Sequence, residues 1–301
     1  MTSGTTFLDR LRERVRATGG VLAVGLNPDS SRLPDDCREY DYPRRAFNRR
    51  IVDATHEEVA AYTVNPAFYE DPSGWTALAE TVAYVRGRGV PVVVDGKWTD
   101  VEAGSPRTDL LDRADAVTLS PFCGRDALAS VLDRDCGGFV VCRTPNRGAA
   151  DLQDRELATG EEAENEETGE ADDETEAQES VAERVATLAG EWAADCEADV
   201  GLLVGGPSDD LEALRAAAPD LPFLVVGGAT NDPEVAEFAV PEERASAAAE
   251  DGLSEGVGLV EVSREVVYAG ETAGRRGGVD AYASAARQSA RRLKRQLNRQ
   301  R

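Results

Sequence analysis

The chain has 301 residues, enough for one large domain, and 41% of them are hydrophobic, which suffices for a sizeable core. Its 57 acidic and 33 basic residues give a net charge of −24, so its surface repels nucleic acids and anionic membranes; with only two lysines, this composition is typical of a halophilic protein. The five cysteines form no Cys-x-x-Cys pair, which argues against a disulfide framework and a zinc site.

Short runs rich in β-branched residues alternate along the chain with amphipathic segments. The predicted strands cover residues 21–26, 62–65, 91–95, 116–120, 138–143, 200–205, 223–227 and 256–262. The clearest helical patterns cover residues 44–60, 74–88 and 180–195. Strands that alternate with helices indicate parallel βαβ units. Eight of them in a single domain, residues 1–301, predict an α/β fold of the TIM (β/α)₈-barrel type. An open doubly wound sheet is the alternative, but no glycine-rich dinucleotide fingerprint follows the first strand.

Two segments interrupt this alternation. Residues 161–179 are nearly all Glu, Asp, Gly, Thr and Ala, so their self-repulsion predicts a disordered acidic insertion in a strand-to-helix loop. Residues 281–301 are rich in arginine and predict a basic C-terminal helix that covers the outer face of the barrel. The chain has neither a signal-peptide pattern nor an apolar run long enough for a membrane span, so we expect a cytoplasmic protein.

The third predicted strand ends in a charged motif, Asp95-Gly-Lys97-Trp-Thr-Asp100. Alternation along a strand places Asp95 and Lys97 on one face, and the carboxyl ends of barrel strands converge on one mouth. Lys97 is one of the two lysines in a chain that otherwise uses arginine, and only lysine can release a proton near neutral pH. A proton-transfer role for Lys97 is the stronger interpretation, and a structural salt bridge at the barrel rim is the alternative.

This motif and the segments around it resemble the orotidine 5′-monophosphate (OMP) decarboxylase family, in particular its longer-chain bacterial and archaeal branch. Asp-x-Lys-x-x-Asp at the end of the third strand is a hallmark of that family. The other matching segments are residues 24–29, 47–55, 62–70, 142–146, 151–154, 204–206 and 262–270. The resemblance spans roughly residues 7–298, apart from the acidic insertion.

The resemblance implies a homodimeric lyase that decarboxylates OMP to UMP in pyrimidine biosynthesis, without a metal or cofactor. Asp95 would lie beside the departing carboxylate, Lys97 would stabilise and protonate the carbanion, and Asp100 would reach across the dimer interface. Residues expected to bind the substrate are Asn27, Thr63, Asn65, Thr144, Gly227, Gly228 and Arg264. Of these, Arg264 matches the arginine that holds the phosphate.

The chain departs from the family pattern at the mouth. Asn27 stands where the family has aspartate, Thr63 where it has lysine, and Pro145 where it has the serine that reads the pyrimidine. The loop after the seventh strand begins Val226-Gly-Gly in place of Gln-Gly-Gly. These departures favour, as the alternative, a non-catalytic or functionally diverged paralogue that binds a nucleotide or sugar phosphate. A sugar-phosphate chemistry with Mg²⁺ between Asp95 and Asp100 fits the other segments less well.

Overall fold

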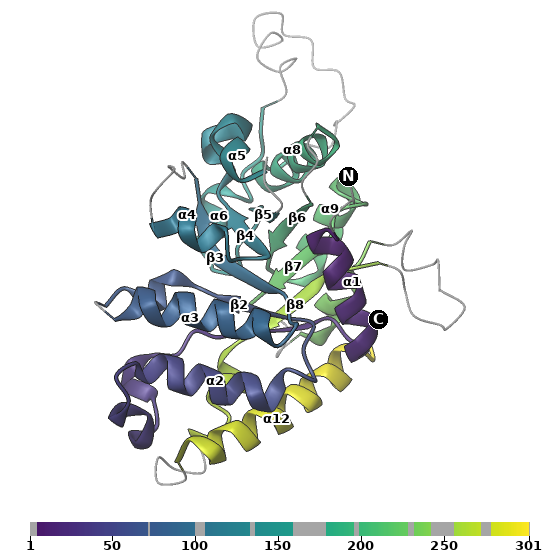
Figure 1. Cartoon of the computed structure of the whole chain (residues 1–301). Coiled ribbons are helices and arrows are strands. Elements are labelled where there is room, and N and C mark those ends of the chain that lie inside the picture. The colour runs from purple at the N-terminus through teal and green to yellow at the C-terminus, as the bar shows by residue number, and fades with distance from the viewer. Residues whose placement is uncertain are drawn as a thin grey trace, which may run out of the picture.

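The computed structural model describes residues 5–71, 73–99, 106–132, 136–158, 179–195, 199–227, 232–241, 256–271 and 278–300. Eight parallel strands follow one another in chain order around a closed barrel, and the last strand pairs with the first. Helices lie around the outside of these strands (Figure 1). The TIM-barrel architecture predicted from the alternating pattern is therefore confirmed.

Each predicted strand coincides with an observed one, within a few residues at its ends. The strands are β1 (Leu22–Gly25), β2 (Ala61–Val64), β3 (Val92–Trp98), β4 (Ala116–Leu119), β5 (Gly137–Val141), β6 (Val200–Val204), β7 (Phe223–Val226) and β8 (Leu259–Val262). Tyr62 faces outward, where its hydroxyl meets Thr55 of the outer layer at 2.6 Å. Its neighbour Thr63 consequently faces the barrel interior, because successive residues of a strand point to opposite sides.

The α-helices are α1 (Phe7–Thr18), α2 (Pro43–Thr55), α3 (Gly74–Gly87), α4 (Pro106–Leu111), α5 (Gly124–Leu132), α6 (Ala149–Leu152), α8 (Val181–Asp195), α9 (Ser208–Ala217), α11 (Arg264–Val267) and α12 (Gly278–Leu297). Five 3₁₀ turns are η1 (Ser30–Arg32), η2 (Asp35–Glu39), η3 (Pro66–Tyr69), η4 (Pro121–Cys123) and η5 (Pro233–Ala239). The helix α2 ends earlier than the pattern predicted, because the Thr55 hydroxyl bonds back to Ile51 and the chain then turns toward β2.

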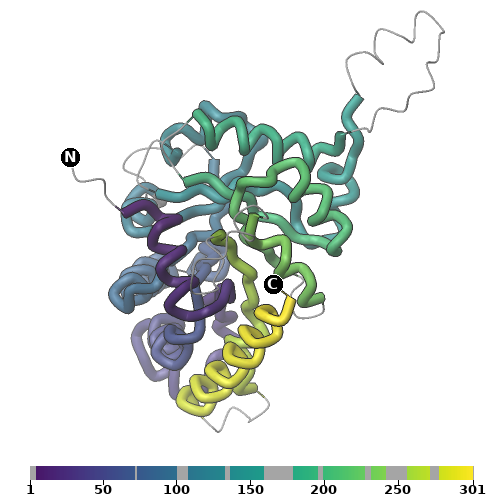
Figure 2. The backbone as a smooth tube through the Cα atoms, turned by 90° about the vertical axis from the view of Figure 1, so that its right-hand side faces the viewer, coloured from purple at the N-terminus to yellow at the C-terminus, as the bar shows by residue number. Residues whose placement is uncertain are grey.

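The helix α1 covers the base of the barrel, where the strands begin. Its Phe7 ring packs edge-on against Phe139, with centroids 5.9 Å apart. The amide of Leu8 donates to the Asp199 carboxylate, which lies just before β6. Figure 2 shows α1 and α12 on the side that faces the viewer, and the side chain of Asn298 donates to the carbonyl of Gly19 where the two helices end.

The C-terminal helix α12 is held to the base by a buried ion cluster. Glu58, which lies just before β2 and is 7% exposed, accepts hydrogen bonds from Arg291 at 2.5 Å and from Lys294 at 2.8 Å. Burial alone would raise the pKa of Glu58, but the bonds from Lys294 and Arg291 outweigh it and lower that pKa. The arginine-rich end of the chain thus lies in a packed helix that begins at Gly278 and ends at Leu297.

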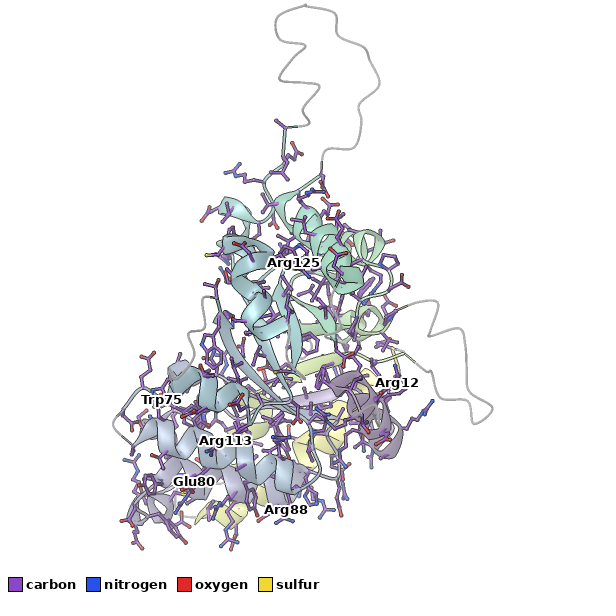
Figure 3. The ribbon with its side chains drawn as sticks, turned by 45° about the horizontal axis from the view of Figure 1, so that its top comes forward. Arg12, Trp75, Glu80, Arg88, Arg113 and Arg125 are labelled. Carbon is purple, nitrogen blue, oxygen red and sulfur yellow. The ribbon has the colours of Figure 1, made fainter. Side chains whose placement is uncertain are left out.

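The outer layer carries charged side chains such as Glu80 and Arg88 of the α3 region (Figure 3). Arg45 of α2 donates to Glu80 and joins the two helices. The acidic insertion leaves and returns at one short antiparallel bridge, Glu156 with Ser180. Residues 161–178 lie outside the described residues, whereas Glu179 is anchored by its backbone bond to Leu157. In the described part of the chain, no helix combines the length and apolarity needed to cross a membrane.

Candidate active site

The charged motif lies in a bulge of β3. Val94 is opposite Val117 of β4 and Trp98 is opposite Leu119, so three residues of β3 face the single residue Thr118. Lys97 has a φ of 49°, a left-handed backbone conformation that residues other than glycine rarely adopt. Bulges beside active sites re-aim side chains, and this one directs the residues between Val94 and Trp98 to the mouth.

Glycine at position 96 is required by the packing of Trp98. A Cβ atom on Gly96 would lie 2.2 Å from the Trp98 ring, and Trp98 is itself buried, with 6% of its surface exposed. The tryptophan is therefore packed beneath the motif, and its backbone carbonyl accepts the amide of Ser120 at 2.9 Å. This contact fixes the end of the bulge against β4.

Asp95 accepts four hydrogen bonds from three neighbours. The Lys97 ammonium donates to both of its carboxylate oxygens, at 2.6 and 2.7 Å. Thr118 donates its hydroxyl to Asp95 at 2.8 Å and accepts the backbone amide of Lys97 at the same distance. Asn65 adds a longer bond of 3.4 Å. The Asp95 side chain is 12% exposed and that of Lys97 is 41% exposed, so the pair stands where the barrel opens to solvent.

Strand β1 continues into a segment that is tied to its neighbours. The Asn27 side chain accepts the backbone amide of Asn65 at 2.7 Å, which ties this segment to the residue whose side chain bonds Asp95. The amide of Asp29 donates to the Tyr268 hydroxyl at 2.7 Å, and the Arg32 guanidinium stacks over the Tyr268 ring. The segments after β1 and β8 are thus held together.

A further acid, Glu261 of β8, points into the barrel beside these residues. It lies opposite Ala23 of β1, which lies opposite Ala61 of β2, and these positions share the inward side with Thr63. One carboxyl oxygen of Glu261 covers Gly25, because a Cβ atom on that glycine would be 2.6 Å from it. Burial, and then the Asp95 carboxylate, raise the pKa of Glu261 to about 7.

Thr63 is fully buried next to this acid. Its hydroxyl lies close enough to lower the pKa of Glu261 somewhat, yet it is outside the geometry of a formed hydrogen bond and has no other partner among the described residues. The position that departs from the family's lysine is therefore a small polar side chain directed at a carboxyl group.

The segment after β5 is braced by a buried arginine. Arg143 pairs with Asp154 and Asp210 at 2.8 Å and donates to the carbonyl of Gly205 at 2.7 Å. The backbone and hydroxyl of Thr144 both donate to Gln153, at 2.8 and 3.1 Å. These contacts hold the segments after β5 and β6 in fixed positions.

The Pro145 ring lies against the glycines that follow β6 and β7. A Cβ atom on Gly227 would be 2.4 Å from this ring, and one on Gly205 would be 2.9 Å from it. Gly227 also has a φ of 79°, so a side chain there would be strained as well as crowded. Pro145 thus packs against the start of the loop after β7.

Arg264 is exposed and begins α11, immediately after β8. Because β7 and β8 are neighbours, Arg264 and Gly227 follow adjacent strand ends. No acid in the described ranges forms an ion pair with Arg264. An exposed guanidinium near a glycine loop is suited to an anionic group such as a phosphate.

The structure therefore brings Asp95, Lys97, Asn27, Asn65 and Thr63 together. Thr144, Gly227 and Arg264 follow other strands at the same end of the barrel. Asp100 and Gly228 lie outside the described residues. Sequence reasoning missed Thr118 and Glu261; the available signal was a single acid within the otherwise apolar strand Leu259–Val262.

No group of three or more His, Cys, Asp or Glu side chains in the described ranges could hold a metal ion. Two hollows, of about 180 and 430 Å³, are lined by residues near the beginnings of strands, such as Asp199 and Asp115. They lie at the base of the barrel, away from Asp95 and Lys97, so the charged cluster at the mouth is the better candidate for chemistry.

Comparison with known proteins adds an independent finding. Residues 21–229 match the family described as "Orotidine 5′-phosphate decarboxylase / HUMPS family". The chain is 44% identical over 302 residues to an orotidine 5′-phosphate decarboxylase of Haloarcula marismortui, covering 97% of this chain and 98% of that protein. It is 43% identical over 300 residues to that of Halobacterium salinarum, covering 98% and 100%. The structure of Leishmania donovani OMP decarboxylase is 29% identical with a TM-score of 0.69, covering 98% of both chains.

Proposed function

The chain belongs to the orotidine 5′-phosphate decarboxylase family, and we propose that it converts OMP to UMP and CO₂ with Asp95 and Lys97 at the reacting carbon. The observation that carries the reaction is the 44% identity to a decarboxylase along 97% of the chain. The halophilic interpretation of the composition agrees with these haloarchaeal relatives. The negative charge, the substrate class and the composition all fit a cytoplasmic enzyme.

In this reaction the bond between C6 of the pyrimidine and the carboxylate breaks, and its electron pair stays on C6. The Lys97 ammonium lies at the mouth with its charge fixed by two bonds to Asp95, so it can stabilise the negative charge that develops on C6. It then gives a proton to C6, and the neutral amine regains a proton from solvent. Asp95 holds the ammonium in place through contacts that exist before the substrate arrives.

The remaining residues would hold the substrate at its two ends. Arg264 and Gly227, at the ends of β8 and β7, would bind the phosphate. Asn27 and Asn65 would contact the ribose beside Asp95, and Thr144 would lie nearer the base. A homodimer, with Asp100 reaching toward the partner's site, is part of this proposal; light scattering in molar salt measures the assembly directly.

The two lysines provide a matched test. OMP consumption is followed in molar salt with purified protein and with two variants, Lys97→Arg and Lys294→Arg. Lys97→Arg keeps the positive charge but removes the transferable proton, so we expect a loss of at least about 10³-fold in kcat. Lys294→Arg is the same substitution at the base of the barrel, and it should leave kcat within a few-fold of the wild type.

Three outcomes separate the alternatives. Turnover that depends on Lys97 supports the proposal. Turnover that survives Lys97→Arg would refute the role of that lysine while leaving the reaction intact. A folded protein that UMP stabilises against heat, but that never consumes OMP, is the non-catalytic paralogue instead.

A further inference from the structure

Two inward-facing carboxyl groups and one ammonium group meet at the mouth of the barrel. Both carboxylate oxygens of Asp95 accept hydrogen bonds from the Lys97 ammonium. Among the described residues, no cation is bonded to Glu261. The charged groups that act on Glu261 are Asp95 and Lys97, both on β3. The elements packed against it present Gly25 of β1, Asn27 just after β1, Thr63 of β2 and Val226 of β7, none of which titrates.

The position of Glu261 depends on the fold and is not that of a surface side chain. Its register with Ala23 and Val226 directs it inward, and the missing Cβ of Gly25 provides the space for its carboxyl group. The side-chain amide nitrogen of Asn27 borders the same space, 3.1 Å from that Cβ position. Glu261 therefore lies beside Asn27, a residue expected to contact the substrate, and near enough to the motif for the charges of Asp95 and Lys97 to act on it.

We propose that Glu261 is a positioning residue of the decarboxylase, which must be uncharged for Lys97 to remain bound to Asp95. In its acid form Glu261 carries no charge and does not attract the Lys97 ammonium away from Asp95. In its ionised form it competes with Asp95 for Lys97, the cation that acts on it within the described ranges, and adds a negative charge where a substrate carboxylate must bind. This inference rests on the proposed function, because it concerns the productive placement of the same amine.

The proton equilibrium of a partly buried acid near a carboxylate supports this assignment. With a pKa raised to about 7, Glu261 would be mostly protonated in mildly acidic solution and mostly ionised in mildly alkaline solution. The rate of decarboxylation should therefore fall on the alkaline side, in proportion to the ionised fraction.

The test is the pH profile of kcat and of kcat/KM for OMP, from about pH 5 to about pH 9 in molar salt, for the wild type and three variants. The wild-type kcat is expected to fall by up to about tenfold per pH unit above about pH 7. Glu261→Gln keeps the shape and cannot ionise, so this fall should be absent, and at about pH 8 the variant should be several-fold faster than the wild type. Glu212→Gln, an exposed change on α9, removes the same charge and should keep the wild-type profile.

The third variant keeps the inference testable if Glu261→Gln does not fold. Thr63→Val removes the hydroxyl that favours the ionised form of Glu261, so the midpoint of the fall should move to higher pH. Identical profiles for the wild type and Glu261→Gln, an equal loss of rate at every pH, or an unmoved midpoint in Thr63→Val would each overturn the inference while the decarboxylase activity stands.

If the wild type consumes no OMP at any pH, it is the proposed function that fails. The role of Glu261 is then tested by calorimetry, which measures the affinity of the wild type and of Glu261→Gln for UMP across the pH range. The comparison of these two proteins cancels the effect of titration of the UMP phosphate. A wild-type affinity that falls above about pH 7 relative to that of Glu261→Gln would support a charge-sensitive acid at the ligand site. Affinities that change in parallel would overturn it.

Discussion

The backbone of Lys97 offers a direct measurement of strain at the mouth. Lys97→Ala removes the ammonium but keeps a Cβ atom at a φ of 49°, whereas Lys97→Gly removes both. A residue with a Cβ atom is destabilised by about 1–2 kcal/mol in the left-handed region. At other positions, glycine lowers the folding stability by about 0.5–1 kcal/mol relative to alanine, because it loses more chain entropy on folding. We therefore expect Lys97→Gly to be the more stable of the two by roughly 0.5–1 kcal/mol, the reverse of the usual order.

Urea unfolding in molar salt, followed by tryptophan fluorescence, measures this difference if the two variants share one m-value. Both should lie within about 1 kcal/mol of the wild type, because an ion pair exposed as Lys97 is contributes little. Ala213→Gly, at an exposed position of α9, serves as the ordinary case and should cost about 0.5–1 kcal/mol. An alanine at 97 that equals or exceeds the glycine in stability would refute the strained bulge.

Three further predictions concern packing and charge. Gly96→Ala places a Cβ atom against the Trp98 ring, so we expect a loss of about 1–3 kcal/mol in unfolding free energy and a lower kcat as Lys97 is displaced. Glu58→Gln leaves two cations without their buried partner, so the free energy of chemical unfolding should fall by about 1–3 kcal/mol, with kcat nearly unchanged. Because the pKa of Glu58 is lowered, the stability that Glu58 contributes is present at neutral pH and is lost as the pH falls through that lowered value. The raised pKa of Glu261 has the opposite sign. Relative to Glu261→Gln, the wild type should lose stability as the pH rises from about 4.5 to about 7, by at most roughly 3.5 kcal/mol at about 1.4 kcal/mol per pH unit. Thermal unfolding of both proteins across that range should show this gap or exclude it.

The strands could be predicted because their signal is local. Buried parallel strands appear as short β-branched runs, and all eight were found in the sequence. The motif was found for a similar reason, since Asp95 and Lys97 are two residues apart at a strand end. Their meeting was predicted from regular alternation, however, and in the structure it depends on a bulge opposite Thr118 and on a left-handed residue.

Glu261 could not be placed from the sequence because its orientation is set by distant pairing. Whether an acid in β8 points inward depends on its register with β1, more than 200 residues away in the chain. The space that it occupies depends on Gly25, whose missing side chain has no meaning until the two strands are adjacent. Thr118 was missed for the same reason, because its role is to span a bulge in the neighbouring strand.

The near absence of lysine has a practical consequence for studying this molecule. Its two ε-amino groups lie at opposite ends of the barrel, one at 41% exposure beside Asp95 and one at 18% exposure against Glu58. A reagent that modifies amines can therefore report occupancy of the mouth by mass spectrometry, with the basal amine as an internal standard in the same polypeptide. Few proteins allow one reactive group to be followed with so little background, and here that simplicity follows from the replacement of lysine by arginine elsewhere in the chain.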